Sequence, residues 1–166
     1  MEGPPVRQHE VQILTLSFQI SGKLEVIGTF LQFLNDPVRD ALLIYEATVV
    51  PLVPGGPLRP LARSQISLRK PEVVFLYLTE PAGRAEVRQL IRKETLIAYT
   101  PLAILRGAFN MSAESRPTDF LATMSADFVL VSEASLFMLT DALTSIPKEC
   151  PLLLVGRQYI QLYHPL

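Results

Sequence analysis

Apolar and polar residues alternate along much of the chain with the two-residue period of β-strands. Residues 11–20 are apolar at nearly every second position, which is typical of a strand with one buried face. A second strand over 23–27 is expected to pair back onto the first. The runs 41–50 and 128–139 are almost continuously apolar and rich in β-branched residues, which favours central strands buried on both faces. The pattern therefore predicts a mainly β protein.

Shorter elements are predicted between and after these strands. Short helical turns are expected over 29–34 and 117–124. Four further strands are expected over 66–68, 73–78, 152–155 and 159–163. Residues 80–91 carry apolar side chains on one helical face and arginines on another, which indicates a linker helix. The loop 51–63 contains Pro-Gly-Gly-Pro and is expected to be exposed.

The two halves of the chain resemble each other. Aligning 29–52 without gaps to 116–139 gives seven identities: Phe33/Phe120, Leu34/Leu121, Asp40/Asp127, Leu43/Leu130, Glu46/Glu133, Ala47/Ala134 and Leu52/Leu139. A shift of two residues extends the match upstream through Arg7/Arg92, Thr15/Thr100 and Gly22/Gly107. A shift of one residue extends it downstream through Leu68/Leu154, Val74/Ile160, Leu76/Leu162 and Tyr77/Tyr163. We therefore predict an internal duplication, with repeats at 7–79 and 92–165 and the linker helix at 80–91.

The order of elements in each repeat resembles known small β-barrels. Leu42-Leu43-Ile44-Tyr45-Glu46-Ala47 is similar to the third strand of Sm-like proteins, in which a glycine also follows the first strand. The resemblance to Sm-like and SH3-like barrels implies a mainly β fold with short helices, made of two tandem five-stranded antiparallel units. Ile20-Ser21-Gly22-Lys23-Leu24 and Phe33-Leu34-Asn35 also resemble an uncharacterised bacterial family that carries such units in tandem, and that resemblance implies no activity.

Composition and charge narrow the classes of protein that this chain can belong to. Hydrophobic residues make up 49% of the chain and charged residues 19%, which excludes an intrinsically disordered protein. The net charge of −1 gives no general attraction to nucleic acid. Apolar runs such as 73–78 fall far short of the ~20 residues that cross a bilayer, so we expect no membrane partner. The start of the chain lacks signal-peptide features and Cys150 has no partner cysteine, which favours a cytoplasmic protein.

Few residues suggest chemistry. Asp40 and Glu46 recur as Asp127 and Glu133, and we interpret them as a turn acceptor and a residue at a strand end or bulge. The chain contains two histidines, at positions 9 and 164, and no cysteine or histidine lies at metal-ligand spacing from either. Nucleophilic catalysis by Cys150 is not favoured, and phosphate or dinucleotide motifs are missing from the sequence. We therefore predict no catalytic residue, no metal and no cofactor.

The Sm-like resemblance implies RNA binding through an asparagine before the third strand and an arginine-glycine pair before the fifth. Here Asp40 and Asp127 stand before the third strands, and the later turns read Arg69-Lys70-Pro71 and Gly156-Arg157-Gln158, so the match is partial. The candidate basic surface for this alternative consists of Arg63, Arg69, Lys70, Arg84, Arg88, Arg92 and Lys93, although the favoured interpretation of these residues is an ordinary solvated surface.

The favoured hypothesis is a noncatalytic protein-interaction or scaffolding module, and the alternative is an RNA-binding Sm-like module. The strands 73–78 and 159–163 carry no Asp, Glu, Lys or Arg, so we expect their edges to be covered by the sister repeat or by a second chain. A protein partner or self-association into a homo-oligomer is therefore predicted.

Overall fold

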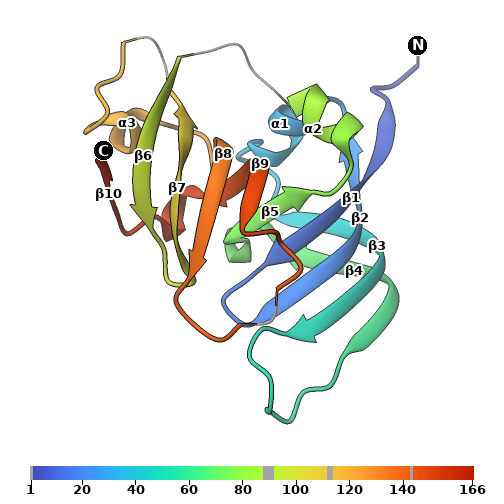
Figure 1. The fold of residues 1–166 in the computed structure, drawn as a ribbon. Helices are drawn as coiled ribbons and strands as arrows, with labels where there is room; N and C mark the ends of the chain where they lie inside the picture. Colours follow the sequence, from blue (N-terminus) through green and yellow to red (C-terminus); the bar gives the residue numbers. More distant parts are fainter. Residues whose placement is uncertain (1, 88–91, 112–113, 143) are drawn as a thin grey trace.

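The computed structural model describes residues 2–87, 92–111, 114–142 and 144–166, and it is mainly β (Figure 1). The strands in the described residues are β1 (Val6–Leu14), β2 (Phe18–Ile27), β3 (Ala41–Pro51), β4 (Leu61–Arg69), β5 (Phe75–Leu78), β6 (Lys93–Tyr99), β7 (Ala103–Asn110), β8 (Phe128–Met138), β9 (Glu149–Gly156) and β10 (Leu162–Pro165). The helices are α1 (Phe30–Leu34), α2 (Pro81–Val87) and α3 (Phe120–Thr123), with single 3-10 turns η1 (Lys70–Glu72) and η2 (Arg157–Tyr159).

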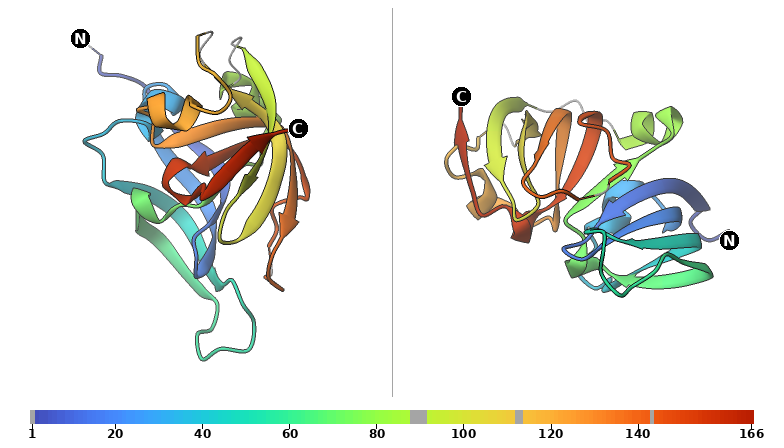
Figure 2. Two further views of the ribbon diagram at one scale, coloured as in Figure 1. Left: turned by 90° about the vertical axis from the view of Figure 1, so that its left-hand side faces the viewer. Right: turned by 60° about the horizontal axis from the view of Figure 1, so that its bottom comes forward.

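The ten described strands form one open antiparallel sheet, in the order β10-β6-β7-β8-β9-β5-β1-β2-β3-β4. The first half contributes β4-β3-β2-β1-β5, and the second contributes β9-β8-β7-β6-β10 in the same internal order. The halves join where Phe75 pairs with Val155 and Leu76 pairs with Leu154. We call this β5–β9 pairing the seam. In Figure 2 the halves appear as two curled lobes side by side. The strands that were predicted as two separate units are thus continuous through the seam.

Each half closes its first hairpin with a threonine. The N–H of Thr15 donates to the Phe18 carbonyl at 2.9 Å, and the N–H of Thr100 donates to the Ala103 carbonyl at 3.0 Å. Each threonine hydroxyl also accepts the N–H of the residue three positions on. The prediction of one strand over 11–20 is therefore wrong, because this turn divides it between β1 and β2.

The recurring glycines lie inside strands, opposite a bulge. A Cβ at Gly22 would lie 2.7 Å from the Tyr45 carbonyl oxygen, and a Cβ at Gly107 would lie 3.1 Å from that of Ser132. Glu46 and Glu133, next in sequence after these two residues, have φ of 50° and 49°. The register of β2 on β3 and of β7 on β8 shifts at the same places. The glutamates are thus bulge residues, as predicted, and the glycines allow a close backbone approach.

A backbone hydrogen bond links the loop before the third strand to the 3-10 turn in each half. The Lys70 N–H donates to the Asp40 carbonyl at 2.6 Å, and the Arg157 N–H donates to the Asp127 carbonyl at 2.9 Å. Each residue of the first pair lies 87 positions before its counterpart in the second pair. The same offset relates the paired residues of β3–β4 to those of β8–β9. The one-residue downstream shift predicted from sequence is therefore wrong, because no residue is inserted between the halves in this segment.

Both halves contribute to each of the two hydrophobic clusters. Phe128, Leu130, Leu152 and Leu154 of the second half pack in the cluster of the first half. In return, residues of the first half that include Phe75 and Tyr77 pack in the cluster of the second half. Burying each such leucine or phenylalanine side chain contributes about 1.5–3 kcal/mol to folding. The seam is therefore a hydrophobic interface on both of its faces.

Most predicted elements are found within a few residues of their predicted bounds, but β4 begins at Leu61 rather than at 66, so the predicted loop 51–63 is wrong over its last three residues. Phe33 and Phe120 are buried in α1 and α3, and Leu130 is buried in β8, whereas its counterpart Leu43 in β3 is only half-buried. The first half covers Leu130, but among the described residues no further unit covers Leu43 in the same way. Of the predicted linker helix, α2 is found, and 88–91 lie outside the described residues. None of the described helices is long and apolar enough to cross a membrane.

Candidate functional site

Strand β4 is an open edge of the sheet. It has nine residues, all exposed except Ile66 and Leu68, which are half-buried. Among the described strands it pairs only with β3, whereas its counterpart β9 is buried between β8 and β5. The opposite edge, β10, has four residues and contains Pro165, which cannot donate a backbone hydrogen bond. The long open edge of the molecule is therefore β4.

The outward face of β4 is polar where the matching face of β9 is apolar. Gln65 and Ser67 of β4 correspond to Leu152 and Leu154 of β9, which face the first half across the seam. Arg63 is exposed near the start of the strand, and its guanidinium donates to the Ala62 carbonyl at 2.8 Å. This face can meet polar or acidic groups, but it is not suited to the apolar contact that β9 makes.

A buried lysine connects the loops of the two halves. The Lys70 Nζ lies 2.7 Å from a carboxylate oxygen of Asp127 and donates to the Asp36 carbonyl at 2.7 Å. The side chain of Lys70 is 6% exposed and that of Asp127 is 44% exposed. Hydrogen bonds to both partners offset the cost of burying the lysine cation. The pair therefore positions the halves, and its cation is already neutralised by Asp127.

Further polar contacts join the halves around this pair. The Asn35 amide oxygen accepts the Phe128 N–H at 2.9 Å, and the Gln158 amide donates to the Pro71 carbonyl. In the sequence, Asn35 stands out only as part of the Phe33-Leu34-Asn35 motif. Neither Asn35 nor Gln158 belongs to the candidate basic surface. A contact between the two halves produces no local sequence pattern from which these residues could have been predicted.

A small cleft of about 250 Å³ opens beside these contacts. Asp40, Lys70, Asp127 and Arg157 are among the residues that line it. Asp40 pairs with Arg69 at 3.4 Å, and both side chains are more than 60% exposed. The carboxylate of Asp40 was predicted as a turn acceptor, but the atom that accepts the N–H of Lys70 is its backbone carbonyl oxygen.

The seven residues of the candidate basic surface are spread over several elements. Arg63 and Arg69 lie exposed on β4, and Lys93 lies exposed on β6. Lys70 is buried. Arg84 of α2 donates to the Tyr77 hydroxyl and to two backbone carbonyls of 78–79. Arg92 forms an ion pair with Glu94 at 2.7 Å. Arg88 lies outside the described residues.

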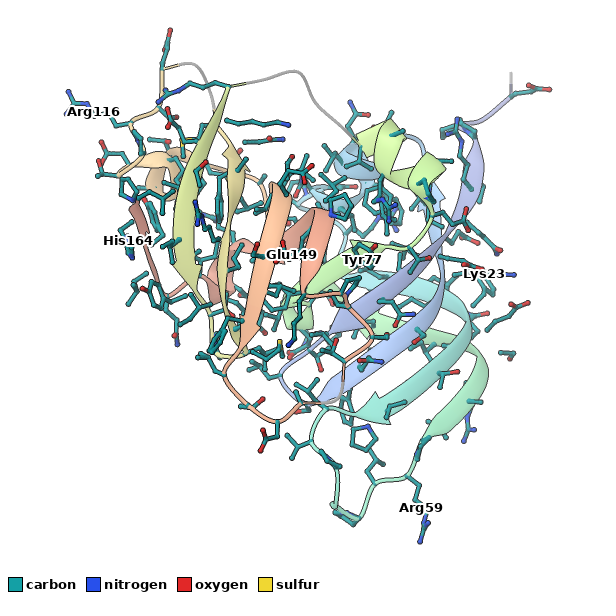
Figure 3. The ribbon with its side chains drawn as sticks, viewed as in Figure 1. Lys23, Arg59, Tyr77, Arg116, Glu149 and His164 are labelled. Atoms are coloured by element: carbon teal, nitrogen blue, oxygen red, sulfur yellow. The ribbon has the colours of Figure 1, made fainter. Side chains whose placement is uncertain are left out.

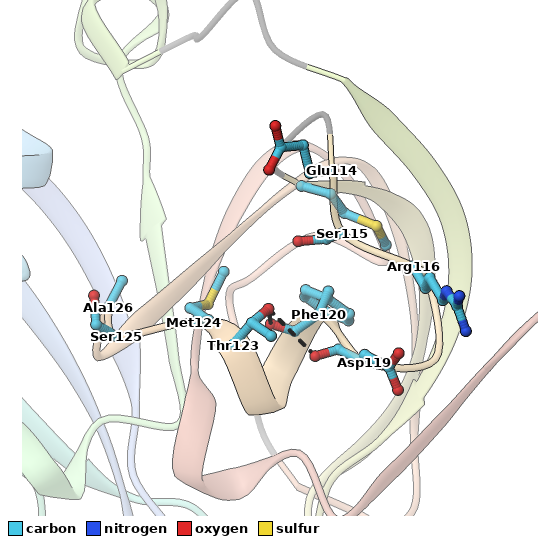
Figure 4. A pocket seen from close by; sticks show the side chains of 10 residues that line it. Glu114, Ser115, Arg116, Asp119, Phe120, Thr123, Met124, Ser125 and Ala126 are labelled. Atoms are coloured by element: carbon cyan, nitrogen blue, oxygen red, sulfur yellow. Dashed lines mark hydrogen bonds between the residues drawn. The ribbon is translucent and has the colours of Figure 1, made fainter.

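A second hollow, of about 610 Å³, lies beside α3 (Figure 4). Phe120, Met111 and Met124 supply apolar walls, while Glu114 and Arg116 stand at its rim. The Thr123 hydroxyl lies within hydrogen-bonding distance of the backbone carbonyls of Asp119 and Phe120. A hollow of about 670 Å³ lies at the matching place in the first half, beside Phe33. Such hollows therefore accompany the helical turns of both halves.

Cys150 and the two histidines make contacts within the fold. Burial raises the pKa of the Cys150 thiol to about 11, and its Sγ lies 3.0 Å from the Pro147 carbonyl oxygen. A thiol with such a pKa is a poor nucleophile near neutral pH. His9 packs edge-on against Phe30, and His164 lies 3.2 Å from the Tyr99 hydroxyl. Among the described residues, no three or more His, Cys, Asp or Glu side chains lie together in a group that could hold a metal ion.

No protein-family model, curated protein or solved structure matches this chain. The resemblance to Sm-like and SH3-like barrels therefore stays a prediction.

Proposed function

We propose that this protein is a noncatalytic protein-interaction module that pairs β4 with an extended segment of a partner protein. The observation that carries the proposal is the open nine-residue edge of β4. Such an edge offers a row of backbone donors and acceptors, and addition of a partner strand is an established mode of peptide recognition. Backbone pairing would give affinity, and the alternating side chains would give specificity.

The partner segment is expected to be acidic on one face and apolar on the other. Leu61, Arg63, Gln65, Ser67 and Arg69 alternate along β4 on one face of the sheet. Two of these five are arginines, so acidic residues opposite them would be favoured. Ile66 and Leu68 lie on the other face and pack against the cluster of the first half. Apolar residues of the partner would extend that cluster.

A different protein is a better partner for β4 than a second copy of this chain. In the seam, the face of β9 that meets the first half presents Leu152 and Leu154, which are almost fully buried. If a second copy paired its β10 with β4, as β5 pairs with β9 in the seam, it would contact Gln65 and Ser67 in place of these two leucines. Its β10 would also bring Pro165, which lacks the N–H that a ladder needs.

The module is best understood as a duplicated unit of about 75 residues, each with an Sm-like or SH3-like arrangement of five strands. The threonine-closed hairpins, the glycine-glutamate bulges and the loop-to-turn hydrogen bonds recur in both halves. These features need particular backbone geometries, so their common order along the chain supports duplication. The seam would then join the two units into a single scaffold.

The proposal can be tested with a displayed library of random ten-residue peptides. Peptides selected on the full chain should carry acidic residues at alternate positions and should slow amide hydrogen exchange across 61–69. Replacing Arg63→Glu should weaken the selected peptides by about fivefold, since one surface charge contact contributes up to about 1 kcal/mol. Lys93→Glu is the matched control, because it makes the same charge change on an exposed residue of β6.

Two results would contradict the proposal. Selected peptides that leave exchange across 61–69 unchanged would place the interaction elsewhere. Binding of a labelled oligouridine that weakens steeply with salt, without protection of β4, would favour the RNA-binding alternative.

A further inference from the structure

The loop between β3 and β4 projects from the end of the protein as an exposed proline-rich segment (Figures 1 and 3). Every residue from Val53 to Gln65 is exposed. The Leu52 N–H donates to the Ser17 carbonyl at 2.9 Å and fixes the base of the loop. Beyond it, across 53–60, no backbone hydrogen bond to another described residue is found. The backbone N–H and C=O groups of 53–60 are therefore not taken up by backbone hydrogen bonds within the described part of the protein.

Within this loop, Pro57-Leu58-Arg59-Pro60 is predisposed to the polyproline II conformation. Ring closure fixes φ near −65° at both prolines, and the residues before them, Gly56 and Arg59, are restricted to extended backbone. A polyproline II helix has three residues per turn and needs no internal hydrogen bonds. Pro57 and Pro60 would therefore lie on the same face of such a helix, about 9 Å apart.

The side chains between the prolines are available for contact. Leu58 is 48% exposed, although it is a large apolar residue. Arg59 makes no ion pair or hydrogen bond with any described residue, and Figure 3 shows it pointing away from the protein. Pro54 is different, because Gly55 has φ +89° and turns the chain between it and Pro57. The surface on offer thus consists of two prolines one turn apart, one leucine and one unneutralised cation.

We propose that Pro57–Pro60 is a docking segment for a partner domain that reads polyproline II helices. Such domains bind with grooves lined by aromatic residues, and the low conformational entropy of a preformed proline segment favours the complex. The exposed cation of Arg59 favours a groove that is flanked by a carboxylate. This site is separate from β4, and the proposal does not depend on partner binding there.

The test uses the isotope-labelled full chain and a panel of SH3 and WW domains that carry an acidic residue beside the groove. At least one domain should produce saturable NMR shifts confined to 53–61. The double variant Pro57→Ala, Pro60→Ala and the variant Arg59→Glu should each weaken that binding at least about tenfold. Pro54→Ala, the matched control beyond the Gly55 turn, should leave it unchanged.

The proposal is overturned if no domain of the panel shifts the loop signals, or if the double variant binds as tightly as the parent chain. It is also overturned if phosphatidylcholine vesicles, rather than the domains, broaden the signals of 53–61, because the exposed leucine and valine would then serve a lipid surface. Thermal melts of each variant check that an exposed loop substitution leaves the fold unchanged.

Discussion

The two equivalent aspartates should differ in their contribution to stability. Asp127→Ala removes the carboxylate that faces the buried Lys70 ammonium at 2.7 Å, while the hydrogen bond from Lys70 to the Asp36 carbonyl remains. Leaving a buried polar or charged group with one partner fewer costs about 1–3 kcal/mol. Asp40→Ala removes a pair in which the atoms are 3.4 Å apart and both side chains are mostly exposed. Such a surface pair contributes about 0–1 kcal/mol.

The difference is large enough to measure by thermal and urea denaturation. For a chain of 166 residues, 1 kcal/mol shifts the melting temperature by about 2–4 °C, so Asp127→Ala should lower it by about 2–12 °C. A double-mutant cycle with Lys70→Met separates the pair from other effects of the substitution. The variant Lys70→Met should also make Asp127→Ala much less harmful. If Asp40→Ala and Asp127→Ala lower stability equally, the argument from burial is refuted.

Three further perturbations test other parts of the structure. Gly22→Ala should destabilise the protein by about 1–3 kcal/mol in urea denaturation, because its Cβ would lie 2.7 Å from a β3 carbonyl oxygen. Gly56→Ala, where a Cβ meets nothing within 4 Å, is its control and should be nearly neutral. Glu133→Gly should raise the melting temperature, since a non-glycine residue at positive φ costs about 1–3 kcal/mol, and an unchanged or lower value would contradict the strain. For Cys150, a folded-state pKa raised to about 11 means that the free energy of unfolding should fall as pH rises from about 9 to 11. A Cys150→Ser variant should lose this part of the pH dependence.

Much of the fold could be predicted because local pattern and backbone chemistry agree. The apolar runs predicted the central strands β3 and β8 almost to the residue, and the recurring glutamates were interpreted as strand-end or bulge residues. The recurring glycines were expected at a turn, but they lie inside β2 and β7. The predicted bounds of a strand were wrong where the turn that ends it contains no glycine or proline. Thr15 closes the first hairpin through its hydroxyl, so the alternating pattern ran through the turn without a visible break.

The relation between the halves could not be predicted in the same way. Strand 73–78 was expected to be covered, and β5 does lie between β1 and β9. The segment 159–163 was expected to be covered as well, yet β10 pairs only with β6 among the described strands. The two segments have similar compositions. They differ in that β5 pairs across the seam, whereas β10 lies at an edge of the sheet. The interhalf contacts of Lys70 and Asn35 depend on the same three-dimensional arrangement.

The seam has a consequence for synthesis of the chain on the ribosome. Val73 to Leu78 form a fully apolar, buried segment, and one edge of β5 is completed only by β9. Translation must continue from residue 78 to residue 155 before that edge can close, which takes roughly 4–15 s at 5–20 residues per second. During this interval the nascent first half exposes the unpaired, apolar edge of β5, which can associate with other chains. Chaperone binding to ribosome-bound chains that end between these two residues, and its loss once β9 has emerged from the ribosome, would be the signature of this dependence.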